Sequence, residues 1–343
     1  MTPDGKVVVL SGIRATGRMH LGNYLGVLER FAALSRDPTR QCFFFIADLH
    51  TLTTHKDASR IRKEAPEIVM DMLAAGVDPA RAVIYIQSRV PVVAELTWYL
   101  ACLAPASEVE KLPTYKDKAA KHPDDVNVGL FAYPVLMAAD ILGPRADFVP
   151  VGVDQKPHLE LTRELARKFN TRYGRYFPVP DDLGEEMLSV PGLVAQDSAG
   201  HFGKMGKSEA PGQTLYLSDT PEVMTRKIRR APTDPARIRR EDPGTPSKCV
   251  IFALHGLVSS DVVVQWSADG CRTAGISCVE CKDALAGSVV ACLADFQERR
   301  LELAAHPERI EEIVEEGSKK ARVVFEETTA YVADCMGVFR PRG

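Results

Sequence analysis

The chain has 343 residues, of which 45% are hydrophobic and 26% charged, a composition typical of a globular protein of one large or two smaller domains. Its formal net charge of −3 excludes an overall positive field, although a local basic surface would be enough to bind nucleic acid. No secretory signal is visible, and no apolar run approaches the roughly 20 residues of a membrane span. We therefore expect a cytoplasmic protein without a membrane partner.

The first half of the chain alternates strand-like and helix-like segments. Short apolar runs at 7–10, 42–47 and 83–86 predict strands, and longer amphipathic stretches between and after them, at 21–34, 61–75 and 92–103, predict helices. Nearly continuous apolar strands that alternate with helices indicate a parallel sheet covered on both faces. The predicted fold class is therefore α/β, with a Rossmann-type doubly wound sheet.

The second half of the chain has a different pattern. From about Pro221 the pattern is mostly helical, and Val289, Leu293, Phe296 and Arg300 fall on one helix face. A polar segment at 209–220 separates the two halves. We expect a Rossmann-type domain at 1–212 and an all-helical domain at 213–343.

A first motif lies where the first predicted strand leads into a helix, and it contains Thr16, Gly17, His20, Gly22 and Asn23. The N-terminus of a helix offers unpaired N–H groups and a positive dipole end, which suit a phosphate. His20 and Asn23 would add donors, and Gly22 would let a flat base approach the backbone. Alone, the motif is equally compatible with a tight connection.

A second motif is Lys204, Met205, Gly206, Lys207 and Ser208, on a predicted mobile loop. Two lysines on such a loop can hold the pyrophosphate of a nucleotide as it leaves. An exposed Lys–Gly loop without function is the alternative. The sequence has no Gly-x-x-x-x-Gly-Lys-Ser/Thr loop, so ATP binding would depend on these two motifs together.

Together the two motifs resemble the HIGH and KMSKS signatures of class I aminoacyl-tRNA synthetases, with Asn23 and Gly206 as the departures. The resemblance implies ATP and Mg²⁺. It also implies catalytic roles for His20, Lys118, Lys204 and Lys207. The residues it implies for ATP binding are Thr16, His20, Gly22, Asn23, Gly152, Asp154, Lys204, Met205, Lys207 and Ser208.

The segment 133–140 resembles the tryptophan-binding helix of bacterial tryptophanyl-tRNA synthetases. Met137 and Asp140 are three residues apart, so they share a helix face. Methionine offers a polarisable surface to an indole ring, and a carboxylate accepts the hydrogen bond of the indole N–H. Phenylalanine would leave that carboxylate unpaired, so the pair favours tryptophan. A structural or surface aspartate is the alternative.

The segment 149–158 resembles the Gly-x-Asp-Gln segment of the same family, which ends a strand beneath the ligands. The resemblance implies that Asp154 faces the ribose or metal and that Gln155 and Tyr133 bind the α-ammonium group. It places His50 against the tryptophan, where a structural histidine is the alternative reading. Leu10 and Arg14 stand where some relatives have Phe and Gln. The residues implied for tryptophan binding are Leu10, His50, Tyr133, Met137, Asp140, Val151, Val153 and Gln155.

The family resemblance implies a homodimeric enzyme that activates L-tryptophan with ATP and transfers it to tRNA(Trp), the helical domain binding the anticodon. Tyrosyl-tRNA synthetases are the nearest alternative, and Met137 with Asp140 disfavours them. A catalytically silent tryptophan- or tRNA-binding protein is a second alternative, against which His20, Lys204 and Lys207 argue. A main and an auxiliary copy of the enzyme would share this sequence pattern.

Four of the eight cysteines lie close together in the sequence: Cys249, Cys271, Cys278 and Cys281. Four thiolates suit a tetrahedral zinc ion or an iron–sulfur cluster, and the spacing does not distinguish them. A subset of bacterial tryptophanyl-tRNA synthetases carries this pattern with a [4Fe–4S] cluster, so the resemblance favours iron–sulfur over zinc, in a structural role. Basic residues at 226–230 and at Arg237, Arg239 and Arg240 precede the cluster and suit either tRNA phosphates or solvent.

Overall fold

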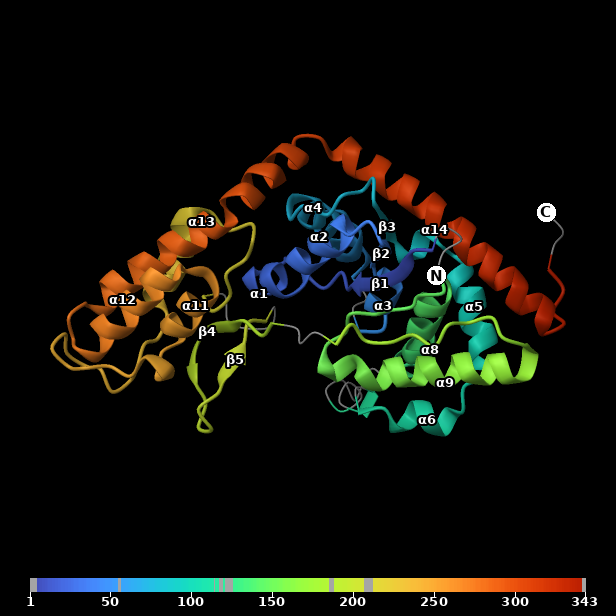
Figure 1. Ribbon diagram of the computed structural model, residues 1–343, viewed down its shortest axis with the longest axis horizontal. Coiled ribbons are helices and arrows are strands. Elements are labelled where there is room, and N and C mark those ends of the chain that lie inside the picture. The colour runs from blue at the N-terminus through green and yellow to red at the C-terminus, as the bar shows by residue number, and fades with distance from the viewer. Residues whose placement is uncertain are drawn as a thin grey trace.

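The computed structural model of the chain is an elongated molecule of two lobes (Figure 1). It describes residues 5–54, 57–113, 115–116, 120, 126–184, 188–206 and 212–340. One lobe is built on a parallel sheet, and the other is mostly helical. The last two helices form a long arch that leads from the helical lobe back over the sheet.

The sheet contains β1 (Val7–Ile13), β2 (Arg40–Ile46) and β3 (Ala82–Ile86), all parallel and in the order β1-β2-β3. Phe148 extends it beyond β1 through a parallel bridge to Val9, and Asp181 bridges Phe148 in turn. All three predicted strands are confirmed. The resulting order is that of a doubly wound sheet, in which ligands bind at the carboxyl ends of the strands.

Alternate side chains of the strands enter two separate cores. Val9, Phe44 and Ile84 pack in one, and Leu10, Phe43 and Tyr85 pack in the other. The first core is covered by α1 (Leu21–Asn23), the π-helical turn η1 (Tyr24–Leu28), α2 (Glu29–Arg36) and α4 (Ala58–Ala74). The second is covered by α5 (Val92–Ala101), α8 (Val128–Leu142) and α9 (Lys156–Tyr173). Burial on both faces explains the nearly continuous apolar strands.

Short elements complete this lobe. They are α3 (Asp48–Thr51), the 3-10 turns η2 (Gln87–Arg89) and η4 (Val153–Gln155), and α6 (Ala106–Lys111). In the described part of the chain, no helix has the length and apolar character needed to cross a membrane.

The helical lobe contains α10 (Pro221–Arg230), η5 (Pro246–Lys248), α11 (Val250–Val258), α12 (Asp261–Arg272) and the first part of α13 (Cys278–Ala304). A hairpin of β4 (Pro191–Gln196) and β5 (Phe202–Lys204), which the sequence analysis did not predict, lies beside it. α13 begins with a capping box between Ser277 and Glu280. Such a box satisfies two otherwise unpaired N–H groups.

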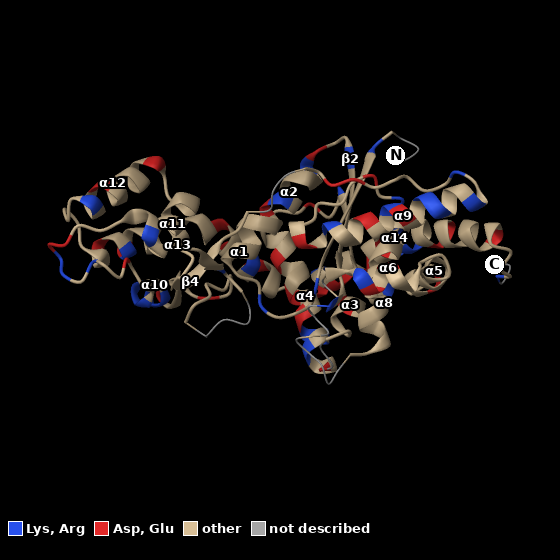
Figure 2. Cartoon of the chain, turned by 90° about the horizontal axis from the view of Figure 1, so that it is seen from below, with Lys and Arg blue, Asp and Glu red and all other residues tan. Residues whose placement is uncertain are grey.

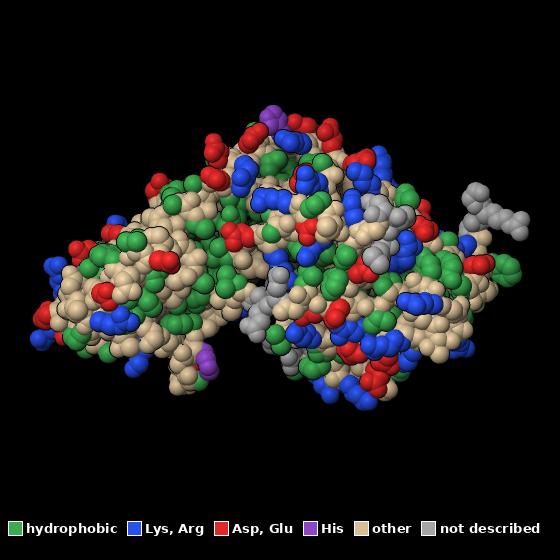
Figure 3. All heavy atoms as spheres, viewed as in Figure 1, with side chains coloured by type: hydrophobic (Ala, Val, Ile, Leu, Met, Phe, Trp, Pro, Cys, Tyr) green, Lys and Arg blue, Asp and Glu red, His purple; other side chains and the backbone are tan. Residues whose placement is uncertain are grey.

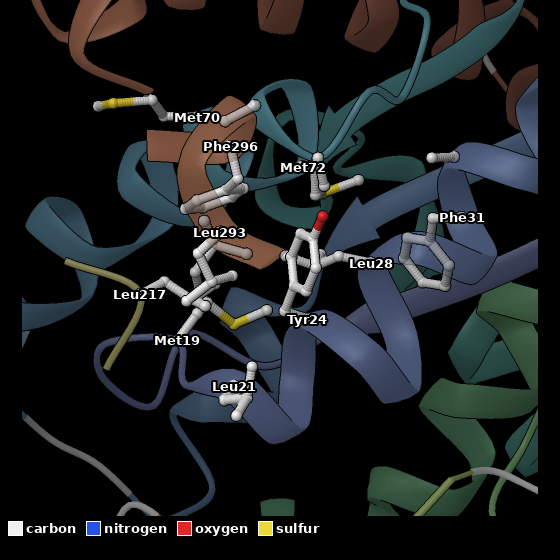
Figure 4. Close-up of a cluster of buried hydrophobic side chains, with 14 of the residues drawn as sticks. Met19, Leu21, Tyr24, Leu28, Phe31, Met70, Met72, Leu217, Leu293 and Phe296 are labelled. Carbon is white, nitrogen blue, oxygen red and sulfur yellow. The ribbon is translucent and has the colours of Figure 1, made fainter. Parts of the chain in front are cut away.

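An apolar junction connects the two lobes. Leu293 and Phe296 of α13 pack beside Met19 and Tyr24 (Figure 4), and the rings of Tyr24 and Phe296 meet edge to face at 5.4 Å. The predicted apolar face of 289–296 is confirmed, since Val289, Leu293 and Phe296 are all buried. The junction lies directly beneath the turn that carries the first motif.

The last helix, α14 (Pro307–Cys335), packs against β3 rather than within the helical lobe. A Cβ atom at Gly317 would lie 1.9 Å from the carbonyl oxygen of Ile84. The ring of Phe325 covers Gly143, and Tyr331 stacks on Tyr176 at 3.8 Å. The helix can therefore approach the strand only because position 317 has no side chain.

We predict that Gly317→Ala lowers the free energy of unfolding by about 2 kcal/mol or more, because the backbones of α14 and β3 would have to separate. Thermal unfolding followed by circular dichroism measures the change. Gly287→Ala is the matched control, since Gly287 lies within α13 with nothing within 4 Å of its added Cβ. That control should gain about 0.5–1 kcal/mol from helix propensity, and equal effects of the two variants would contradict the packing argument.

Candidate active site

A buried group of polar side chains lies at the carboxyl ends of β2 and β3. Asp140 of α8, 1% exposed, is bonded to His50 of α3, whose Nε2 lies 2.8 Å from Oδ2 of Asp140. The amide nitrogen of Gln87 donates to both Asp140 oxygens, at 2.7 Å to Oδ1 and 2.9 Å to Oδ2. Three elements that are distant in sequence therefore converge on one carboxyl group.

The electrostatics of Asp140 are set by burial. Loss of water raises its pKa, and the hydrogen bonds from His50 and Gln87 act in the opposite direction, while the nearby Asp48 raises it further. A buried carboxylate without partners would be strongly disfavoured. The two donors therefore allow an ionisable acceptor to exist in the interior.

Tyr133 extends the same face of α8 towards α9. Its hydroxyl lies 2.9 Å from Nε2 of His158, and its ring meets that of His50 edge to face at 6.2 Å. Met137, half-buried, lies between Tyr133 and Asp140 in the sequence and falls on the same helix face. The structure thus brings together four of the predicted residues, namely His50, Tyr133, Met137 and Asp140.

The other predicted pocket residues are distributed between core and surface. Leu10 and Val151 are buried in the core that also holds Ala138 and Ala139. Val153 is 74% exposed, and Asp154 is exposed and accepts a 2.6 Å hydrogen bond from the side chain of Gln155. The structure does not bring Val153 into the buried group around Asp140. Gly152 caps η4 immediately before them.

Two further polar residues of this site were not among the residues predicted to bind a ligand, although Arg14 had been noted where some relatives have Gln. Arg14 follows β1, and its Nη2 donates to Oγ1 of Thr54 at 2.6 Å and to the carbonyl of His50 at 3.3 Å. Burial lowers the pKa of its guanidinium, and the nearby Tyr133 raises it. Gln87 follows β3 in the same way. The usable signal was a polar residue directly after an apolar strand, where parallel sheets place their ligands.

The turn of the first motif is organised by its own side chains. His20 is the N-cap of α1: its Nδ1 accepts from the N–H of Asn23 at 3.3 Å, and Asn23 Oδ1 accepts from the N–H of His20 at 3.1 Å. A Cβ at Gly22 would lie 3.1 Å from Nδ1 of His20. Gly22 therefore leaves room for the His20 ring. Thr16 lies half-buried at the start of the turn.

The second motif is partly within the structure. Lys204, predicted on a mobile loop, is instead the exposed last residue of β5, because that strand pairs with β4. Met205 is 2% exposed, and the carbonyl of Gly206 accepts from Thr214 Oγ1 at 2.8 Å. Lys118, Lys207 and Ser208, also predicted as functional, lie outside the described residues.

Backbone hydrogen bonds join the two motifs in space. The N–H of Leu21 donates to the carbonyl of Leu215 at 2.9 Å, and that of Leu217 donates to the carbonyl of Met19 at 3.0 Å. Residues 215–217, which lie between the second motif and α10, thus pair with the turn of the first motif. Two motifs that bind opposite sides of one nucleotide would have to lie close together in this way.

Asp219 reinforces the pairing. It is 7% exposed and accepts from Arg18 at 3.0 Å and from Lys227 of α10 at 2.6 Å. Both cations also lie over the ring of Tyr216, at 4.4 Å for Arg18 and 4.8 Å for Lys227. Gln297 of α13 donates to the carbonyl of Asp219 at 2.8 Å. The turn that carries the first motif is therefore linked through Asp219 to the helical lobe.

The four clustered cysteines lie at one end of the helical lobe. Cys249 is the N-cap of α11, Cys271 lies in the last turn of α12, and Cys278 and Cys281 lie in the first turn of α13. Burial raises the pKa of Cys281 to about 12, and the other three thiols raise it too. The four are therefore neighbours, with the buried Arg237 beside Cys271.

In the part of the chain that the structure describes, no three His, Cys, Asp or Glu side chains stand close enough to hold a metal ion as they are. The predicted ligands are therefore near one another without forming a closed coordination shell. Among them, Cys281 also approaches a histidine, with its Sγ 3.6 Å from Nε2 of His255.

The basic residues before the cluster have different environments. Arg226, Arg229 and Arg230 are exposed on α10 (Figure 2), and Arg229 is paired with Asp283. Lys227 is directed inwards to Asp219, and Arg237 is buried. Positive and negative side chains are intermingled on the face seen in Figure 3. The exposed arginines of α10 are thus a local basic surface on a weakly acidic chain.

Comparison with known proteins gives a consistent result. Residues 2–294 match the family of class I tRNA synthetases (W and Y). The chain is 39% identical to the tryptophan–tRNA ligase of Deinococcus radiodurans, over 97% of this chain and 99% of that protein. It is 37% identical to that of Thermotoga maritima, over 96% and 99%.

Solved structures agree with these relatives. The crystal structure of tryptophanyl-tRNA synthetase from Campylobacter jejuni, complexed with ADP and tryptophan, superposes with a TM-score of 0.85 at 30% identity. That comparison covers 97% of this chain and all of the other. The protein belongs to the class I tRNA synthetases of the tryptophan and tyrosine branch, whose fold is the expected parallel sheet with a helical C-terminal region.

We predict that Asp219→Ala lowers the free energy of unfolding by about 3 kcal/mol, because the variant leaves the half-buried Lys227 without its carboxylate. Thermal unfolding measures the loss. Asp283→Ala, which removes the partner of the exposed Arg229, is the control and should leave the melting temperature almost unchanged. A similar small effect at Asp219 would show that the network does not hold the lobes together.

Proposed function

We propose that this protein is an enzyme that activates L-tryptophan with ATP and transfers it to tRNA(Trp). The observation that carries the proposal is the buried Asp140 carboxyl group, held by His50 and Gln87 on the helix face that also presents Tyr133 and Met137. The full-length relatives named as tryptophan–tRNA ligases support the same substrate. We propose that the enzyme acts in the cytoplasm, where translation takes place.

Tryptophan recognition rests on the indole N–H. Asp140 would accept this hydrogen bond while the half-buried Met137 contacts the ring face. A charge-assisted bond of this kind contributes about 1.5–3 kcal/mol. Phenylalanine has no donor at this position and would leave the carboxylate desolvated and unpaired, which disfavours it.

The ammonium and carboxylate groups of the amino acid would contact different residues. Gln155 and Tyr133 are proposed to bind the α-ammonium group, with Leu10, Val151, Val153 and His50 as further contacts. Val153 would have to leave its exposed position for this. Arg14 adds a cation close to His50 and Tyr133. It is suited to the carboxylate that reacts.

ATP would lie between the two motifs. His20, Asn23, Thr16 and Gly22 are proposed to bind it at the N-terminus of α1, where unpaired N–H groups favour phosphate. Gly152 and Asp154 are proposed for the ribose side, and Lys118, Lys204, Met205, Lys207 and Ser208 for the phosphate side, where Mg²⁺ would neutralise negative charge. The pairing of 19–21 with 215–217 supports this arrangement.

The reaction needs no nucleophile from the protein. A carboxylate oxygen of tryptophan attacks the α-phosphorus of ATP, a new P–O bond forms, and the bond to the departing pyrophosphate breaks. The lysines stabilise the negative charge on the phosphates, and positioning supplies the remainder. A hydroxyl of the terminal tRNA ribose then attacks the acyl carbon, and AMP leaves.

We propose a different function for each lobe. Residues 1–212 are proposed as the catalytic domain and 213–343 as the domain that reads the anticodon, with the exposed arginines of α10 as candidate contacts to tRNA phosphates. We propose a homodimer, and Trp98 on α5, 70% exposed, is a large apolar side chain available for such a contact.

We further propose that Cys249, Cys271, Cys278 and Cys281 hold a [4Fe–4S] cluster, with zinc as the less favoured occupant. The donor set fits, because four thiolates are the usual ligands of such a cluster. The buried Arg237 supports it, since a cation beside Cys271 offsets the negative charge of the thiolates. The group would connect α11, α12 and α13 and so stabilise the helical lobe.

The first test is ATP–pyrophosphate exchange with tryptophan, tyrosine and phenylalanine. We predict exchange with tryptophan alone, and for Asp140→Asn a fall of about 100-fold in kcat/KM for tryptophan, because the indole N–H loses a charged acceptor. Asp269→Asn on the exposed face of α12 is the control and should match the unaltered protein. Exchange with tyrosine would refute the assignment, and no exchange by folded protein would favour a silent binding protein.

The cluster is tested on protein purified without oxygen. We predict about four iron and four sulfide per chain and a broad absorbance near 400 nm, both lost in Cys271→Ser. Cys102→Ser, at an exposed cysteine outside the four, should keep both signals. One zinc per chain without sulfide would assign the site to zinc, and unchanged iron in Cys271→Ser would exclude this cysteine as a ligand.

A further inference from the structure

Gln87 is an interior polar side chain to which the reaction above assigns no role. It directly follows β3, and its residue is 1% exposed. Its amide nitrogen reaches both oxygens of Asp140, at 2.7 and 2.9 Å. A donor that spans both oxygens fixes the rotation of the carboxyl plane as well as its position.

The hydrogen bonds that Asp140 accepts from the described residues leave few of its acceptor positions open to a donor on a ligand. A carboxylate has about four acceptor positions, two on each oxygen. Oδ2 receives His50 at 2.8 Å as well as Gln87, whereas Oδ1 receives Gln87 alone. Among the described residues, the open position therefore belongs to Oδ1.

The other end of the Gln87 amide is unusual. Its Oε1 is buried and has no hydrogen-bond partner among the described residues. An unpaired buried carbonyl destabilises a folded protein. Among the described residues, the hydrogen bonds of the Gln87 side chain therefore all go to Asp140, and no wider polar network explains its presence.

We propose that Gln87 is a positioning residue for substrate specificity: it turns the Asp140 carboxylate so that Oδ1 faces the indole N–H of the amino acid. This inference rests on the proposed function, because it assumes that tryptophan binds at Asp140. Gln87 would thus help the enzyme to select an amino acid that has an N–H at this position over an isostere that lacks it.

The pH dependence of binding follows from the same geometry. His50 and Asp48 of α3 and Tyr85 of β3 are the titratable groups near Asp140. Burial raises the pKa of Asp140, and the bonds from His50 and Gln87 lower it. Tryptophan needs the ionised form, so its kcat/KM falls as pH drops through this pKa. Loss of the Gln87 donor raises the pKa, so that decline moves to higher pH.

The test is Gln87→Met, which keeps the length of the side chain and removes both polar atoms. Pyrophosphate exchange is measured with tryptophan and with β-(3-benzothienyl)alanine, an isostere in which sulfur replaces the N–H. We expect kcat/KM for tryptophan to fall about 10- to 100-fold, while the value for the analogue changes less than about threefold. The pH below which kcat/KM for tryptophan declines should rise.

Tyr85→Phe is the matched control. Tyr85 lies in β3 two residues before Gln87, and its hydroxyl is also buried without a partner among the described residues. It makes no hydrogen bond to Asp140. Removing the hydroxyl should leave both kcat/KM values and the pH profile within about twofold of the unaltered protein, since no contact to the substrate-binding carboxylate is lost.

Each failure has a distinct meaning. Equal losses for tryptophan and the analogue in Gln87→Met would overturn the proposal, because they indicate a pocket that is merely disturbed. Unchanged discrimination and an unchanged pH profile would overturn it as well. If the unaltered protein exchanges with tryptophan but does not prefer it to the analogue, the role of Asp140 fails. If it shows no exchange, the proposed function itself fails.

Discussion

Two backbone hydrogen bonds, from Leu21 to Leu215 and from Leu217 to Met19, join the turn of the first motif to the segment that leads from the second motif to α10. They are short-range and directional, so they specify register in a way that apolar contacts do not. The ion pairs of Asp219 and the packing of Phe296 on Tyr24 add further contacts at this junction. The position of the first motif relative to residues 215–217 is therefore set by one small antiparallel pairing.

The interior of the sheet lobe contains a different kind of contact, between buried polar groups. Asp140, His50 and Gln87 are almost removed from solvent, where polar groups are costly unless they are paired. A carboxylate in such a place interacts strongly with a donor that reaches it and strongly disfavours a ligand without one. Under the proposed function, the same desolvation that weakens the folded state would discriminate between amino acids of similar shape.

Much of the sheet lobe was predictable, because apolar strands such as 42–47 are buried on both faces and are therefore nearly continuous in sequence. Of the site, His50, Tyr133, Met137 and Asp140 are brought together as the resemblance implied, and their roles remain proposals. The β4–β5 hairpin was missed, and Lys204 was placed on a loop, because the short Phe202–Lys204 strand depends on a tertiary partner. Gln87 was missed because one glutamine carries no periodic signal. The partner of 307–335 was equally invisible, since an amphipathic pattern gives a helix its apolar face but not the surface that covers it.

The position of α14 has a consequence for the order in which the protein folds. β3 is the last strand of the β1-β2-β3 sheet, and α14 packs against it through Gly317. This helix is the final element of the described chain, so during synthesis the ribosome releases it after the sheet has already emerged. Until then, β3 lacks its cover, and uncovered edge strands invite pairing with other chains. Translation speed near the C-terminus, and chaperones that shield nascent chains, would therefore affect the yield of this protein more than its equilibrium stability suggests.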